Sequence, residues 1–252
     1  MSITVKALFA IGILSGICTN TQAQAFRDYT NDANRTLEGV KNKGNGGSGS
    51  LSQADISDGL RQALQIGAQN ATKKVSAADG FFGNAMIKIL MPPEAKKVEN
   101  TLRQAGMGDY VDHAILSMNR AAEDASAKAL TIFVDAIKSM SIQDALSILN
   151  GGNNAATEYL KNKTTADLTK AFRPIIQEAL DKVDATKYWA QVFDTYNSLP
   201  TTFKKVNPDL PAYVTEKALD GVFFYIADEE AKIRKNPAAQ VTDLLKRVFG
   251  SH

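Results

Sequence analysis

The sequence predicts an all-α fold, a single bundle-like domain of roughly eight to ten helices with one long central helix. Apolar residues recur at spacings of three and four over most of the chain after residue 51. No stretch sustains the alternation of apolar and polar residues that is typical of a half-buried strand. Glycine and proline separate the helical segments, and the short loops between them favour antiparallel neighbours.

The first helices are delimited by a capping residue, by proline and by glycine. Ser52 is a suitable N-cap, so a helix is predicted over 52–75. A short helix is predicted over 84–90, because two prolines follow directly and end it. The next helix is predicted over 93–104, with a proline in its first turn and Gly106 just past its end.

One long helix is predicted over 109–140. Its apolar stripe has alanine in the middle, which allows a neighbouring helix to approach closely. We therefore expect this helix to run through the centre of the domain.

The remaining segments show the same signals, a capping residue before the apolar run and glycine or proline after it. Helices are predicted over 141–151, 154–162, from Thr165 onward with a kink or a joint at Pro174, and over 184–199, 211–235 and 236–249.

Residues 1–25 are predicted to form a secretory signal peptide. An apolar run over 7–17 follows a basic residue, and residues 23–25 read Ala-Gln-Ala, a typical cleavage site. The run is shorter than the ~20 residues that span a bilayer, so no transmembrane span is expected in the mature chain. We expect a periplasmic or secreted protein.

The alternative is a lipoprotein anchored to the membrane through Cys18. A lipidation site normally has a small residue directly before the cysteine, whereas here Ile17 occupies that position. Residues 26–50 are rich in Gly, Asn and Ser and are predicted to be a flexible linker that leads into the all-α domain, 51–252.

The composition excludes several functional classes. The 29 basic and 27 acidic residues nearly balance, which argues against a nucleic-acid partner. The chain has one cysteine and two histidines, too few for a cysteine-rich metal site or for a di-iron bundle. We therefore predict no metal and no cofactor.

Two helices carry a group of polar residues that form the candidate ligand-binding set. Asn119, Arg120 and Glu123 lie in the long helix, and Glu230 and Arg234 lie near the end of the 211–235 helix. One interpretation places the two carboxylates across a cleft, where the arginines orient a polar or anionic ligand and the carboxylates can serve as an acid–base pair. The alternative is a partly buried ion-pair network that fixes the helices in register, or simply a solvated face.

Aromatic residues give a second signal. Trp189, Phe193 and Tyr196 follow helical spacing and share one face. Such a face is either a core anchor or the wall of an apolar pocket or partner-binding groove.

Several strings resemble the bacterial domain-of-unknown-function family 4197 (DUF4197). They are MNRAAE at 118–123, ILNG at 148–151, AATEYL at 155–160, ALDG at 218–221, EEAKIRKNP at 229–237 and LLKRVFG at 244–250. The resemblance covers nearly all of 51–250. It implies an exported, envelope-associated all-α protein without a settled activity, and it identifies no catalytic residue.

The leading hypothesis is a non-catalytic exported protein that binds an apolar, lipid-like molecule or a protein partner in the bacterial envelope. The first alternative is a carboxylate-dependent enzyme that uses Glu123 and Glu230 with Arg120. The second is a purely structural scaffold.

Overall fold

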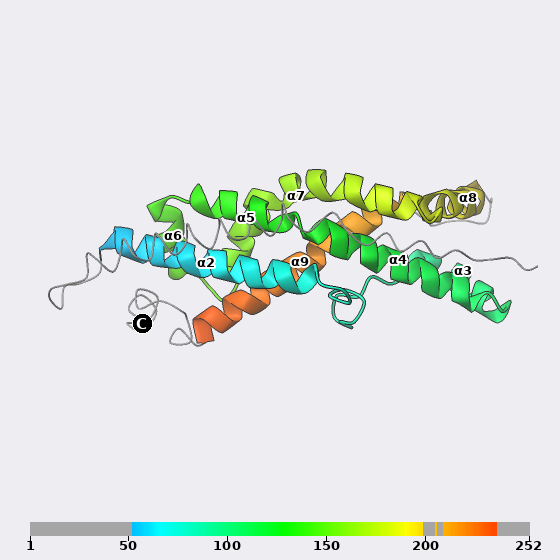
Figure 1. Ribbon diagram of the computed structural model, residues 1–252, viewed down its shortest axis with the longest axis horizontal. Helices are drawn as coiled ribbons and strands as arrows, with labels where there is room; N and C mark the ends of the chain where they lie inside the picture. The colour runs from blue at the N-terminus through cyan, green and yellow to red at the C-terminus, as the bar shows by residue number, and fades with distance from the viewer. Residues whose placement is uncertain (1–51, 199–204, 206–208, 236–252) are drawn as a thin grey trace, which may run out of the picture. The chain divides into compact units, whose positions relative to one another are not determined.

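The computed structural model describes residues 52–198, 205 and 209–235, all within the compact unit Leu51–His252. Every regular element in that part is helical, which confirms the all-α class (Figure 1). The elements are α2 (Gln53–Val75), the 3₁₀ helix η1 (Pro93–Ala95), α3 (Lys96–Gln104), α4 (Gly108–Ser126), α5 (Ala129–Lys138), α6 (Ile142–Leu149), α7 (Ala155–Asp181), α8 (Ala185–Ser198) and α9 (Leu210–Lys235).

The expected signal peptide, the linker and the helix over 236–249 lie outside the described residues. The predicted total of eight to ten helices is therefore not confirmed for the whole chain. The ranges predicted for α2, α6, α8 and α9 agree with the structure to within the one or two residues by which helix ends are ordinarily defined. The helix predicted over 93–104 corresponds to η1 and α3 taken together.

Reciprocal capping explains why α2 and α6 begin where the sequence predicts. At the start of α2, the Ser52 hydroxyl accepts a hydrogen bond from the Asp55 N–H, and the Asp55 carboxylate accepts one from the Ser52 N–H, both at 3.1 Å. Ser141 and Asp144 repeat this arrangement at α6. The hydrogen bonds from Ser141 also lower the pKa of Asp144. Each cap satisfies donors that the first helical turn leaves without a partner.

The end of α3 is set by a glycine. Gly106 has a φ of 78°, in the left-handed region that suits glycine. The Met107 N–H bonds to the Leu102 carbonyl at 2.9 Å, and the Gly106 N–H bonds to the Arg103 carbonyl at 3.1 Å. This pair is the Schellman motif, which closes α3 as predicted.

The helix predicted over 84–90 is wrong, because this segment forms turns. The Asn84 side-chain oxygen accepts a hydrogen bond from the Met86 N–H at 3.0 Å, which stabilises a turn. The backbone N–H and carbonyl of Ile89 both bind the side chain of Asn119, at 2.9 and 2.8 Å. A partner from another helix thus replaces the hydrogen bonds of a local helix.

The single long helix predicted over 109–140 is also wrong, since α4 and α5 are separate. The Lys128 N–H bonds to the carbonyl of Ala125, three residues back rather than four. The buried Ser126 hydroxyl donates to the Ala122 carbonyl at 2.7 Å, an interaction that often bends helices. After the turn, α5 contacts α2 and α7, whereas α4 contacts these two helices and also α3 and α9.

The two helices predicted over 154–162 and from Thr165 are in fact one helix, α7. The Thr165 hydroxyl donates to the Lys161 carbonyl at 2.6 Å, so this residue is satisfied inside the helix and does not cap a new one. Pro174 lies within the same helix.

Helix α9 packs against helices from several parts of the described chain. It contacts α2, α4, α7 and α8, and Figure 1 shows it running obliquely past α2 and α4. The buried rings of Phe133 and Phe223 meet edge to face, with centroids 5.8 Å apart. Phe81 packs directly on Gly221, whose missing side chain leaves room for the ring.

A charged network joins α9 to α2. The Glu229 carboxylate accepts hydrogen bonds from Lys74 at 2.9 Å, Lys232 at 2.8 Å and Asn70 at 3.0 Å. Burial raises the pKa of Glu229, but the hydrogen bonds from Lys232, Lys74 and Asn70 outweigh it and hold the pKa below its ordinary value. The network fixes the register of the two helices.

We predict that Gly221→Ala destabilises the protein through the contact with Phe81. A Cβ at this position would lie 2.2 Å from the Phe81 Cε1 atom, and that ring is fully buried. Overpacking of this kind costs about 1–3 kcal/mol, which exceeds the gain of up to about 1 kcal/mol from alanine in a helix. Urea unfolding would measure the difference.

Gly67→Ala in α2 is the matched control for this substitution. Its Cβ would meet Ile233 at 3.4 Å, an ordinary contact, so this variant is expected to keep or gain stability. Equal effects of the two substitutions would contradict the packing described for Gly221.

Candidate functional site

Glu123 of α4 anchors the turn that follows α2. One carboxylate oxygen accepts hydrogen bonds from the backbone N–H groups of Phe81 at 3.0 Å and Phe82 at 3.2 Å. The other oxygen accepts one from Arg120 at 2.6 Å, and Arg120 also binds Asp79 at 2.7 Å. The Glu123 residue is only 3% exposed. Its charge is therefore compensated inside the core by three donors.

Asn119 lies one turn earlier on α4 and anchors the second half of the same loop. It is fully buried, and its carboxamide pairs with both backbone groups of Ile89. Its amide nitrogen also donates to the Ile115 carbonyl at 2.7 Å. Asn119 and Glu123 together hold the non-helical connection between α2 and η1 against α4.

Glu230 of α9 has a comparable role at the start of α7. Its carboxylate accepts hydrogen bonds from the N–H groups of Ala156 at 3.1 Å and Thr157 at 2.8 Å, and from the Thr157 hydroxyl at 2.7 Å. Arg234 donates to the same carboxylate at 2.9 and 3.0 Å and to the Ile148 carbonyl of α6 at 3.0 Å. A negative charge is favourable here because the first N–H groups of a helix lack helical partners.

The five predicted ligand-binding residues form two separate groups. Glu123 and Glu230 share no hydrogen-bond partner among the described residues. Phe81, whose N–H binds Glu123, packs on Gly221, nine residues before Glu230 and about 13 Å away along α9. Their use in ligand binding stays a prediction, and their geometry gives both carboxylates a structural role.

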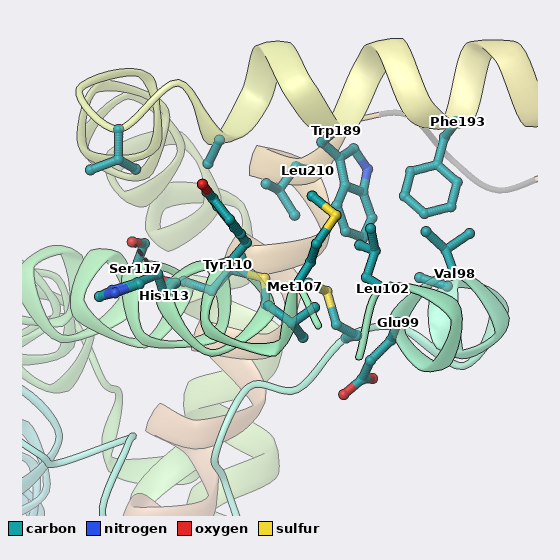
Figure 2. A pocket seen from close by; sticks show the side chains of 17 residues that line it. Val98, Glu99, Leu102, Met107, Tyr110, His113, Ser117, Trp189, Phe193 and Leu210 are labelled. Carbon is teal, nitrogen blue, oxygen red and sulfur yellow. Dashed lines mark hydrogen bonds between the residues drawn. The ribbon is translucent and has the colours of Figure 1, made fainter. Parts of the chain in front are cut away.

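A cavity of about 650 Å³ lies between α3, α4 and α8 (Figure 2). Its lining is mainly apolar and comes from α3, α4, α8 and α9, from η1 with the segment before it, and from the turns before α4 and α8. The apolar lining includes Met91, Val98, Leu102, Met107, Val111, Met118, Val183, Trp189, Phe193 and Leu210.

Two aromatic residues of α8 form one wall of this cavity. The rings of Trp189 and Phe193 lie 4.4 Å apart between centroids, at 49° to each other. Figure 2 shows both side chains projecting from α8 toward Val98 and Leu102 of α3. The sequence predicted that Trp189 and Phe193 share a face, and the side chain of the third member, Tyr196, lies outside the described residues.

The polar lining of the cavity comes from α3 and α4. Glu99 is bound by Arg103 at 3.0 Å, and Arg103 also binds Asp112 at 2.7 Å, which lowers the pKa of Asp112. Tyr110 and His113 line the cavity from α4, and Ser117 follows them on the same face. Within the described part of the chain, neither the Tyr110 hydroxyl nor the His113 ring makes a hydrogen bond.

The α3 wall and the Tyr110–His113 edge were not predicted from the sequence. One available signal was the spacing of Val98 and Leu102, a single apolar ridge on an otherwise polar helix. Among the described residues, no group of three or more His, Cys, Asp or Glu side chains is placed to hold a metal ion. No helix of that part is long and apolar enough to cross a membrane.

Comparison with known proteins supports the family resemblance. Residues 50–250 match the family described as protein of unknown function (DUF4197), and the chain belongs to this family. Neither the curated proteins nor the solved structures contain a match.

We predict that Glu123→Gln lowers the free energy of unfolding by about 1–3 kcal/mol, because one of its three donors loses its acceptor in the core. Urea unfolding would measure the loss. The matched control is Asp79→Asn, which weakens only the exposed side of the Arg120 network and should cost less than about 1 kcal/mol. Equal losses would contradict the anchoring role of Glu123.

Proposed function

We propose that this member of DUF4197 binds an apolar, lipid-like molecule in the α3–α4–α8 cavity and catalyses no reaction. The observation that carries the proposal is the cavity itself, about 650 Å³ in volume and lined by Trp189, Phe193 and aliphatic side chains. This volume lies within the range of about 300–1,000 Å³ that is typical of small-molecule sites.

Exposed apolar side chains at the cavity support the proposal. Tyr110 is 71% exposed, Val183 53% and Met107 42%, and all three line the cavity. A bound apolar molecule would remove such surface from water, which contributes about 25 cal/mol for each Å². Exposed apolar residues that gather around a hollow are a stronger indication of binding than scattered ones.

The loose packing of α3 also supports the binding of an apolar molecule in this cavity. None of its residues is buried, and its main helical neighbour in the described part is α4. Its apolar residues Val98 and Leu102 face the cavity (Figure 2). A ligand between α3 and α8 would give this apolar ridge a packing partner.

The two alternatives receive less support. Glu123 and Glu230 are 3% and 4% exposed, and both accept several hydrogen bonds, so neither is placed to exchange protons with a substrate. A scaffold role accounts for these polar groups but not for the cavity. An envelope protein that inserts an apolar helix into the same hollow is the remaining alternative.

We predict that Ala114→Phe fills the cavity and weakens binding of the neutral apolar dye Nile red at least about tenfold. Ala114 lines the cavity from α4. Trp189, the only tryptophan of the chain, also lines it, so its emission provides a second readout. Fluorescence titration of the full mature chain would measure both signals.

The matched control is Ala166→Phe, the same substitution at an exposed position of α7, which should leave dye binding unchanged. Failure of the wild-type protein to bind the dye would contradict the proposal. Native mass spectrometry of protein from its own envelope would show whether a small molecule or a protein partner co-purifies.

The proposal includes export to the envelope, supported by the apolar run over 7–17 and the Ala-Gln-Ala string at 23–25. We predict that the mature chain begins at Phe26, and intact mass analysis of the native protein would check this. A chain that begins at a lipid-modified Cys18 would support the lipoprotein alternative. An uncleaved chain would contradict both.

A further inference from the structure

We infer that the ligand is a single-chain carboxylic acid, bound with its head group at Tyr110 and His113 and its hydrocarbon tail between α3 and α8. This inference rests on the proposed function and adds a chemical class and an orientation to it.

The cavity has two chemically different ends. Figure 2 shows Tyr110, His113 and Ser117 together on α4 at one end. At the other end, Val98 of α3 faces Phe193 of α8, with Leu102 beside them. A molecule that fills the whole space therefore needs a polar end and an apolar end.

The polar end offers hydrogen-bond donors. Among the described residues, the Tyr110 hydroxyl and the His113 ring have no hydrogen-bond partner. The Ser117 hydroxyl donates to the His113 carbonyl at 2.9 Å, which leaves its oxygen as an acceptor only. Tyr110 and His113 can thus both donate to a ligand oxygen.

The hydrogen-bond donors at the polar end favour a carboxylate head group over an ammonium group. Glu99 is the acidic residue of the lining, and Arg103 binds it at 3.0 Å. Asp112, next to His113, is bound by the same Arg103 at 2.7 Å. An ammonium group would find these carboxylates already paired, whereas a carboxylate would meet the two donors on Tyr110 and His113.

The size of the cavity favours one hydrocarbon chain. A space of about 650 Å³ suits a single molecule of drug size. A fatty acid of about twelve to sixteen carbons belongs to that class, whereas a phospholipid with two acyl chains is far larger.

The orientation can be tested with Trp189, which lies on the α8 wall and is the only tryptophan. Bromine quenches tryptophan emission on contact. We expect 12-bromododecanoate to quench the full mature chain more strongly than 2-bromododecanoate at equal occupancy. Equal quenching, or stronger quenching by the 2-bromo acid, would overturn the orientation.

The head-group contacts can be tested with the double variant Tyr110→Phe, His113→Leu. It should weaken dodecanoate binding about tenfold through the loss of two hydrogen bonds. Binding of Nile red, which has no carboxylate for these donors, should weaken much less than binding of dodecanoate. An unchanged far-UV circular dichroism spectrum would show that the variant is folded. An unchanged affinity for dodecanoate, or tighter binding of dodecylamine than of dodecanoate by the wild type, would overturn the inference.

These outcomes are separate from those of the proposed function. If the wild-type protein binds Nile red but not dodecanoate, only the inference fails. If it binds neither, the proposed function fails as well.

Discussion

The hydrogen bonds from α4 to the backbone of the loop between α2 and η1 are the constraint on which the rest of the packing depends. This loop has no helical hydrogen bonds of its own to satisfy Phe81, Phe82 and Ile89, and Glu123 and Asn119 supply the partners. Unsatisfied buried backbone groups are costly. Because the loop is fixed, Phe81 can occupy the space above Gly221 and α9 can pass close to it.

Near the C-terminal end of α9, a buried carboxylate again accepts hydrogen bonds from the backbone of another element. Glu230 satisfies the first N–H groups of α7, and Arg234 extends the connection to the end of α6. Residues that look like a catalytic carboxylate pair in the sequence thus connect secondary structure elements in the fold. The polar groups fix the arrangement of the helices. The space proposed for a ligand lies elsewhere, in the cavity between α3 and α8.

There is a physical reason why the buried carboxylates fix the helices while a different, apolar region is proposed to bind the ligand. A carboxylate that already accepts two or three hydrogen bonds in a nearly sealed environment gains little from a ligand. An apolar hollow has the opposite property, because any apolar occupant removes surface from water. We therefore propose that Trp189 and Phe193 provide the apolar contacts to the ligand. In the same proposal, Tyr110 and His113 bind its head group and so determine its orientation.

The sequence by itself determined the helical class, the family and most helix ends, since periodicity, capping boxes at Ser52 and Ser141 and the glycine at 106 all act locally. It also placed Trp189 and Phe193 on one face. Only the tertiary structure decided that 84–90 is not a helix, that α4 and α5 are separate and that α7 is continuous. In the 84–90 segment the deciding hydrogen bonds join residues about thirty positions apart, and beyond the α4–α5 turn α5 packs on α2 and α7, whereas α4 also packs on α3 and α9. No local pattern encodes such partners, and the cavity exists only because elements from separate parts of the chain leave a space between them.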